Sequence, residues 1–296
     1  MTLFVGNQVV FIIHAYNWRA LQMSIMLKIL LFYLLQLSIM SQPAKVNGSS
    51  GGKHFVLVHG ASHGAWCWYK VTTFLEAAGH TVTAMDLTAS GVNPKRVTEV
   101  LSFLDYIKPL LEFMESQPET EKIILAGHSV SGKATSAAME KYPQKISVAV
   151  FLAATMERPM TGKTQGGNLN LSAQSYKLLY KNKVPVGILL TPEFYKSQYY
   201  RLSPAEDYQL GKALWRFFPF KGENSSEVVL TAENYGTVRR VFVVCDPEKS
   251  MAWQRRAIEA YPPDEVIILN DSDHMVMFSK PKELADQLKG IAGRYV

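Results

Sequence analysis

The sequence predicts an α/β fold with a mostly parallel, doubly wound sheet and one inserted cap. From Lys53 to Leu152, short apolar runs of strand length alternate with segments that have helical periodicity, and the alternation resumes at Arg240. Between these two parts, at about residues 153–235, it stops. Alternating strands and helices produce a parallel sheet covered on both faces, and ligands bind at the carboxyl edge of such sheets. The interruption is therefore interpreted as a cap over that edge.

The predicted strands are short apolar runs bounded by turn residues. They are His54–Val58, Thr81–Ala84, Ile123–Ala126, Ile146–Leu152, Arg240–Val244 and Glu265–Leu269. Parallel strands need a crossover connection, usually a helix, and this places all their carboxyl ends at the same edge of the sheet. Loops that follow different strands are therefore expected to meet there.

The predicted helices carry apolar residues at intervals of three and four, as an amphipathic helix requires. They cover 65–78, where Gly79 is placed to end the helix, and then 97–116, 131–142, 252–261 and 281–294. The cap region is rich in Tyr, Phe, Leu and Pro. Within it, helical pieces are predicted near Ser172–Tyr180 and Pro204–Trp215.

Composition and charge exclude several classes of function. The chain has 296 residues and a net charge of +6, and no basic run is interleaved with aromatic residues, so no nucleic-acid partner is expected. The two cysteines, Cys67 and Cys245, lie in apolar surroundings and form no disulfide framework. This favours a reducing compartment, and the protein is predicted to be cytoplasmic.

The first 52 residues form a separate hydrophobic extension before the predicted domain at 53–296. Its apolar run Ile29–Met40 is too short for a membrane span but has the length of a signal-peptide core. The run begins far from the initiator methionine, and Met23, Met26 and Met40 are alternative starts. A signal-like or a disordered extension both fit this composition, and secretion and membrane association remain open alternatives.

The segment Gly127-His128-Ser129-Val130-Ser131 follows an apolar strand and precedes a helix. This is the pattern of a nucleophile elbow, in which strained backbone presents a serine at the carboxyl edge of the sheet. Ser129 is therefore the candidate nucleophile, and the alternative is an ordinary turn serine. The fifth position of the motif normally holds glycine, but here it is Ser131, followed by Gly132.

A base and an acid are expected on the loops after later strands, in the order nucleophile, acid, base. His274 follows the strand that ends at Leu269 and is the only histidine in the C-terminal half, so it is the candidate base. Its alternative role is structural, ahead of the last helix. Asp246 and Glu248 follow the strand that ends at Val244, and either is a candidate acid. Both residues also suit a purely capping role at a helix start.

Stabilisation of a negative oxygen requires two backbone N–H groups near the nucleophile. The amide of Val130, directly after Ser129, is one candidate, and the amide of Ala61 in the turn after the first strand is the other. An ordinary Gly-rich loop is the alternative reading of that turn. Three nearby histidines lack acidic or cysteine partners, and no Gly-X-Gly-X-X-Gly fingerprint occurs, so neither a metal nor a cofactor is expected.

Several longer segments carry a resemblance to the plant methylesterase family of the α/β-hydrolase superfamily, which includes methyl jasmonate and salicylate-binding esterases and is related to the hydroxynitrile lyases. The resemblance covers Lys53 to Val296. The segments are His54–Lys70, Ala78–Pro94, Gly127–Gly132, Glu140–Ala154, Leu230–Cys245 and Ser272–Pro281.

The resemblance implies an α/β-hydrolase fold and a carboxylesterase without a cofactor. Its nucleophile would be Ser129 and its base His274. The implied substrates are small methyl esters of plant hormones and metabolites, such as methyl salicylate, methyl jasmonate and methyl indole-acetate. The related lyases need Thr and Lys at the positions where this chain has Gly60 and Met275. The resemblance therefore favours ester hydrolysis over cyanohydrin cleavage. The oligomeric state is left open, with a homodimer as one alternative.

The chain departs from the family pattern at three places. Ser131 replaces a glycine, and Glu248 stands at the acid position in a loop that looks shortened, with Asp246 as the alternative acid. The segment after Ala154, where the family builds part of its acyl pocket, also looks shortened. Two alternatives to an esterase follow: a hydrolase-fold hormone-binding protein with little turnover, and a hydroxynitrile lyase.

Overall fold

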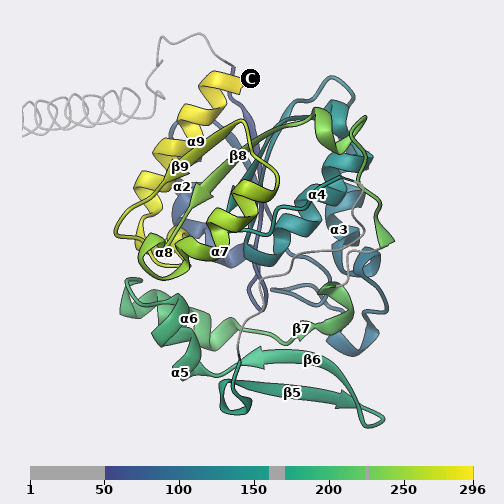
Figure 1. Ribbon diagram of the computed structural model, residues 1–296, viewed down its shortest axis with the longest axis vertical. Helices are drawn as coiled ribbons and strands as arrows, with labels where there is room; N and C mark the ends of the chain where they lie inside the picture. The colour runs from purple at the N-terminus through teal and green to yellow at the C-terminus, as the bar shows by residue number, and fades with distance from the viewer. Residues whose placement is uncertain (1–50, 160–170, 224–226, 296) are drawn as a thin grey trace, which may run out of the picture. The chain divides into compact units, whose positions relative to one another are not determined.

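A six-stranded sheet in the order β2-β1-β3-β4-β8-β9 forms the centre of the computed structural model, which describes residues 51–159, 171–223 and 227–295 (Figure 1). Every neighbouring pair of strands is parallel, as predicted. The strands are β1 (His54–Val58), β2 (Thr81–Met85), β3 (Ile123–His128), β4 (Ile146–Leu152), β8 (Arg239–Val244) and β9 (Glu265–Ile268).

The strand order reverses at β1, and this reversal positions the site. The chain adds β2 on one side of β1 and then β3 on the other side. Loops that leave such a pair of strands run in opposite directions, so a crevice opens at their carboxyl ends. The turn after β1 and the Gly127–Ser131 segment after β3 both lie at this switch point.

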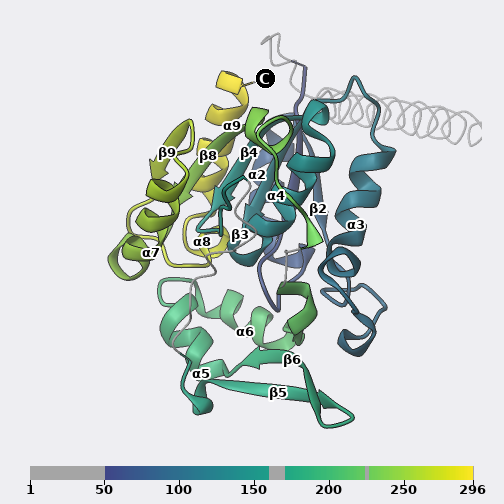
Figure 2. The same cartoon turned by 45° about the vertical axis from the view of Figure 1, so that its right-hand side comes forward.

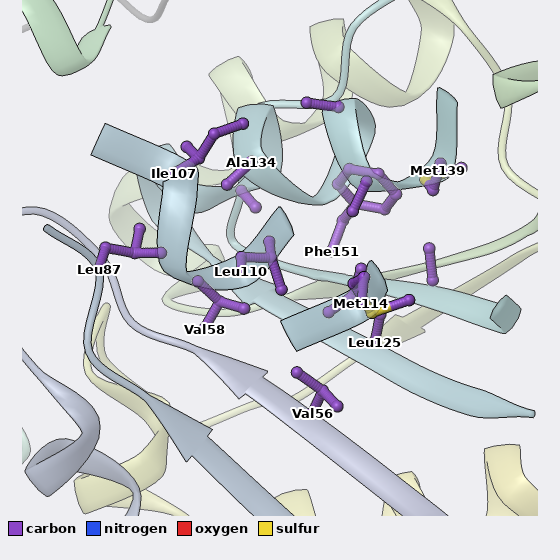
Figure 3. Close-up of a cluster of buried hydrophobic side chains, with 14 of the residues drawn as sticks. Val56, Val58, Leu87, Ile107, Leu110, Met114, Leu125, Ala134, Met139 and Phe151 are labelled. Carbon is purple, nitrogen blue, oxygen red and sulfur yellow. The ribbon is translucent and has the colours of Figure 1, made fainter. Parts of the chain in front are cut away.

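Two layers of helices cover the sheet. Figure 3 shows one buried cluster, in which Val56 and Val58 of β1 and Phe151 of β4 pack with side chains from α3 and α4. On the opposite face, α2 and α9 cover a second buried cluster. The helices are α2 (Tyr69–Ala77), α3 (Phe103–Ser116), α4 (Gly132–Lys141), α7 (Pro247–Ala260), α8 (Val276–Ser279) and α9 (Pro281–Tyr295).

Three helices start elsewhere than the periodicity predicts. A 3₁₀ turn at Val97–Glu99 precedes α3, because Ser102 caps α3 by accepting the Asp105 amide with its side chain. A 3₁₀ turn at Ala65–Trp68 similarly precedes α2. In contrast, α7 begins five residues before the predicted Ala252, with Pro247 in its first turn, where its missing N–H costs nothing. Glu248 therefore lies inside a helix and not in a loop.

The described part of the cap region between β4 and β8 contains a three-stranded antiparallel sheet and two α-helices. The helix predicted near Ser172–Tyr180 is wrong: after a short 3₁₀ turn, this segment enters strand β5. Asn182 and Lys183 both have positive φ and form a two-residue hairpin turn, whose twist suits paired strands. The cap elements are β5 (Tyr176–Lys181), β6 (Val184–Leu190), β7 (Phe218–Pro219), α5 (Pro192–Phe194) and α6 (Ala205–Leu214).

Figures 1 and 2 show the cap strands and α5 and α6 together at one end of the central sheet. An ion pair joins the two parts: Lys70 Nζ of α2 lies 2.5 Å from Asp207 Oδ2 of α6, and Tyr69 Oη donates to the other carboxylate oxygen at 2.8 Å. Asp207 is buried, so its charge is compensated within the protein. No helix in the described ranges is both long and apolar enough to cross a membrane. Residues 1–50 of the hydrophobic extension lie outside them.

Candidate active site

Ser129 occupies a strained turn directly after β3. Its φ of 57° lies in the left-handed region, which costs a residue other than glycine about 1 kcal/mol or more. The surrounding structure holds this conformation: the Ser129 carbonyl accepts the Thr155 amide at 3.1 Å, and a 3₁₀ turn leads into α4. Strand, strained serine and helix follow one another as the elbow motif predicts.

Two glycines, and not the fifth motif position, allow the close packing of this elbow. A Cβ on Gly132 would lie 1.8 Å from the Thr155 carbonyl oxygen, and one on Gly127 would lie 2.1 Å from Thr135 Oγ1. Ser131 is itself buried, and its hydroxyl donates a hydrogen bond to the His59 carbonyl. A serine therefore fits at position 131, where it links the elbow to the turn after β1.

The candidate base contacts the candidate nucleophile. His274 Nε2 lies 3.1 Å from Ser129 Oγ, although the two residues are 145 positions apart in the chain. The His274 carbonyl accepts a hydrogen bond from His128 Nε2 at 2.8 Å. Burial, followed by the neighbouring His128 and His63, lowers the pKa of His274 well below its usual value. The imidazole is therefore neutral at neutral pH and able to accept a proton.

The turn after β1 brings Ala61 to the same place. A Cβ on Gly60 would lie only 3.1 Å from Ser129 Cβ, so this glycine allows the turn to approach the nucleophile. Within the described part of the chain, the Ala61 N–H donates to no other group. The Val130 N–H belongs to the first turn of a helical segment, where amides lack an intrahelical acceptor. Both predicted amides are thus available to a ligand oxygen.

A buried histidine, His63, fixes the peptide that follows Ala61. His63 Nδ1 lies 2.8 Å from the Ala61 carbonyl, which can only accept, so Nδ1 carries the proton. Its Nε2 then accepts hydrogen bonds from Tyr200 Oη at 2.6 Å and Trp215 Nε1 at 3.3 Å. Burial lowers the pKa of His63 to about 3, which keeps the ring neutral. Two cap residues therefore support the orientation of the Ala61 turn.

The two candidate acids lie beside the site, but their carboxylates face the cap. The carboxylate of Asp246 is buried, and its Oδ1 accepts a hydrogen bond from Arg201 Nη2 at 2.8 Å. Glu248 has a side chain that is 69% exposed, and its Oε2 lies 3.3 Å from the same guanidinium nitrogen. Within the described ranges, neither carboxylate is hydrogen-bonded to His274. The structure thus brings Ser129 and His274 together, and it pairs both acids with Arg201.

Sequence reasoning missed the cap segment from Tyr199 to Ser203. The Tyr199 ring lies 4.4 Å from the His274 ring, and its carbonyl accepts the Met275 amide. The buried Asp273 carboxylate accepts the amides of Leu202 and Ser203 at 2.8 and 2.7 Å. No local motif identifies these residues, because only the folded cap places them against the His274 loop.

A cavity of about 340 Å³ lies over Ser129 and His274. Its described lining includes no Lys, Arg, Asp or Glu side chain, so it suits an uncharged group. The described residues include no group of three or more His, Cys, Asp or Glu side chains arranged to hold a metal. The cap contributes Leu171, Ile188, Leu190, Tyr195, Tyr199, Phe218 and Phe220, and the central domain Gly60, Ala61, Ser62, His63, His128, Ser129, Val130, His274 and Met275.

Comparison with known sequences identifies the family of this chain. The model of the alpha/beta hydrolase family matches residues 55–287. Methyl jasmonate esterase 1 of Vitis vinifera is 46% identical over 263 residues, which cover 82% of this chain and 98% of that protein. Methylesterase 9 of Arabidopsis thaliana is 41% identical over 82% of this chain and 99% of its own length.

Solved structures show the same fold. Tomato methylketone synthase I, in complex with 2-tridecanone, is 43% identical and superimposes with a TM-score of 0.78, covering 83% of this chain and 99% of its own. Polyneuridine aldehyde esterase is 37% identical, with a TM-score of 0.75 over 81% of this chain and 99% of that one. The chain therefore belongs to the alpha/beta hydrolase family and, within it, to the plant methylesterases.

Proposed function

We propose that this protein is a carboxylesterase that hydrolyses small methyl esters of plant hormones or metabolites, with Ser129 as nucleophile and His274 as base. The observation that carries the proposal is the 3.1 Å contact between Ser129 Oγ and His274 Nε2, at a strained elbow that opens into an apolar cavity. Relatives named as esterases of small molecules support the reaction class.

The proposed reaction uses only groups of this chain and water. His274 Nε2 accepts the Ser129 proton as Oγ attacks the ester carbonyl, and the Ala61 and Val130 amides stabilise the negative oxygen that forms. The protonated His274 then gives its proton to the methoxide oxygen as its bond to the carbonyl carbon breaks, and methanol leaves. Water, deprotonated by the same imidazole, hydrolyses the acyl-enzyme and regenerates Ser129.

The loop after β8 is the proposed source of the acid, and Asp246 is better placed there than Glu248. The Asp246 amide donates to Ser272 Oγ at 3.0 Å, so its backbone is attached to the loop that carries His274. Its side chain is buried, whereas the Glu248 side chain, in the first turn of α7, is mostly exposed. A water-exposed carboxylate stabilises a buried imidazolium poorly, since solvent screens the interaction.

The cavity favours a neutral ester with an apolar acid part. Burying a charged group without a partner is costly, and no charged side chain stands among the described residues of the lining. Aromatic side chains from the cap, Tyr195, Tyr199, Phe218 and Phe220, suit a planar or cyclic acid of small size. Methyl salicylate, methyl jasmonate and methyl indole-acetate all meet these requirements.

One observation favours slow turnover, the alternative in which the protein mainly binds a hormone: among the described residues, neither candidate acid is hydrogen-bonded to His274. An imidazole without a carboxylate partner is a less well-oriented base, and its protonated form lacks a counter-charge. No such observation supports the hydroxynitrile lyase alternative. The lyases need Thr at the position of Gly60, and here glycine leaves open the space beside Ser129 that a side chain would crowd.

A panel of esters tests the proposal. Purified protein is expected to release free acid from at least one of methyl jasmonate, methyl salicylate and methyl indole-acetate, measured by liquid chromatography. Cyanide release from mandelonitrile and acetone cyanohydrin is measured in parallel and expected to be absent. Saturable binding of the esters without release of acid would contradict an esterase and support the hormone-binding alternative.

The pH profile of the esterase is expected to extend to unusually low pH. Only neutral His274 accepts a proton, so kcat/KM falls as pH drops through the pKa of His274 in the free enzyme. Because burial lowers that pKa well below 6.5, activity at pH 6 is expected to stay near its plateau. An ordinary histidine would leave only about a quarter of the activity there. A midpoint at or above pH 6.5, measured with an uncharged ester, would contradict this.

A further inference from the structure

A single cap arginine holds both candidate acids. Arg201 Nη2 lies 2.8 Å from Asp246 Oδ1 and 3.3 Å from Glu248 Oε2. Arg201 directly follows Tyr199 and Tyr200, which contact His274 and His63. Arg201 thus connects the cap segment that covers His274 to the loop after β8, which is the proposed source of a carboxylate for His274.

The Asp246 backbone is nevertheless hydrogen-bonded to the loop that carries His274. Strands β8 and β9 are parallel neighbours, so the loops that carry Asp246 and His274 leave the same edge of the sheet. The Asp246 amide donates to Ser272 Oγ, and that hydroxyl donates to the Leu269 carbonyl at 2.6 Å. Asp246 has a φ of 51° at the start of α7, and its side chain makes no capping hydrogen bond. Its carboxylate is therefore committed to Arg201 and not to the helix.

His274, in turn, has an unused position for an acceptor. Its Nε2 faces Ser129, and no hydrogen bond among the described residues involves Nδ1. A seryl hydroxyl that donates to Nε2 requires the tautomer in which Nδ1 carries the proton. A carboxylate at Nδ1 would hold this tautomer and stabilise the imidazolium that forms during the reaction.

We propose that Arg201 is a positioning residue that competes with His274 for the Asp246 carboxylate. While Arg201 holds Asp246, Ser129 and His274 act as a dyad, and release of Asp246 completes a triad. The Arg201 side chain is 25% exposed, so water can replace Asp246 as its partner. This inference rests on the proposed function for its kinetic consequence, but the competition itself can be measured without turnover.

The test compares Arg201→Gln with the double variant Arg201→Gln/Asp246→Asn. Glutamine keeps much of the side-chain length but cannot form the ion pair. We expect kcat for a methyl ester to rise about tenfold in the single variant, because the tautomer of His274 is then held by Asp246. The double variant is expected to lose this gain. Lys196→Gln, which removes an exposed positive charge from the same cap segment, is the matched control and should leave kcat unchanged.

An NMR titration of His274 provides a readout that does not depend on turnover, with the signal assigned by its loss in His274→Gln. A neighbouring carboxylate raises the pKa of a histidine by roughly 1–3 units, so the pKa of His274 should rise in Arg201→Gln and return in the double variant. The acid limb of kcat/KM should move upward with it.

The titratable rings around His274 do not change charge near pH 7, so a shift in the NMR titration of His274 can be assigned to Asp246. Burial lowers the pKa of His128 to about 4 and that of His63 to about 3, and it raises the pKa of Tyr199 to about 12, so all three are neutral near pH 7. Asp273, the preceding residue, is present in every variant, and the double variant separates its effect from that of Asp246.

Two results would overturn the inference. One is an unmoved pKa of His274 in a folded Arg201→Gln protein, with folding checked by circular dichroism and the unfolding temperature. The other is a rise in pKa or kcat that persists in the double variant, since that change could not come from Asp246. If Arg201→Gln does not fold, Arg201→Lys, which keeps the charge but loses the guanidinium geometry, should give a smaller rise in the same pKa. A protein that shows the NMR shift but hydrolyses no ester would refute the proposed function alone.

Discussion

Ser129→Ala is expected to abolish ester hydrolysis, lowering kcat by about 10⁴-fold or more. Without the Oγ nucleophile no acyl-enzyme forms, and the Ala61 and Val130 amides can assist only direct attack by water. Alanine also fits the elbow sterically, because the strained φ of 57° is imposed by the surrounding structure. The measurement is release of free acid from the best ester of the panel, with ester binding followed in parallel by fluorescence.

The matched control is Ser136→Ala, the same substitution two turns further along the chain. Ser136 is buried in α4, where its hydroxyl donates to the Gly132 carbonyl and does not line the cavity, so this variant should keep kcat within a few-fold. Ester affinity should stay close to that of the unmodified protein in both variants. Unchanged turnover in Ser129→Ala would refute the assignment of the nucleophile.

His274→Ala is expected to lower kcat by a similar factor of about 10⁴, because the Ser129 hydroxyl is a weak nucleophile when no base accepts its proton. The two residues act as one unit, so the double variant Ser129→Ala/His274→Ala should lose little more than either single variant. Acid release from the same ester gives all three values.

His80→Ala controls for the loss of a histidine. His80 directly precedes β2 and does not line the cavity, and its Nδ1 accepts only the Lys53 amide in the described structure. We expect its kcat to be unchanged. If the losses of the two single variants multiply in the Ser129/His274 double variant, the two side chains act independently, and the dyad mechanism is wrong.

Sequence patterns predicted the central sheet well because its inner strands, β1, β3, β4 and β8, are mostly buried. β3 and β4 are nearly continuous apolar runs, as strands covered by helices on both faces require. The cap was predicted less well. The segment from Tyr176 to Lys181 mixes exposed and half-buried residues without clear alternation, and its strand state depends on pairing with β6.

The elbow illustrates what a motif can and cannot say. The pattern around Ser129 predicted its strained position. However, the motif expects glycine at position 131, and close packing does not require glycine there. The three-dimensional packing assigns the close approach to Gly127 and Gly132, whose neighbours Thr135 and Thr155 are not part of the motif. Ser131 departs from the usual residue and is still accommodated by a hydrogen bond to the turn after β1.

The sequence by itself determined the order of the strands and helices of the central domain, the candidate nucleophile and the candidate base, because each depends on residues that are close together in the chain. Only the tertiary structure decided where the acids point. Asp246 and Glu248 precede His274 in the predicted order, but their carboxylates pair with Arg201, which the cap delivers from 45 residues before Asp246. Electrostatic attraction depends on distance in space, so the partner of a carboxylate cannot be read from its position in the sequence.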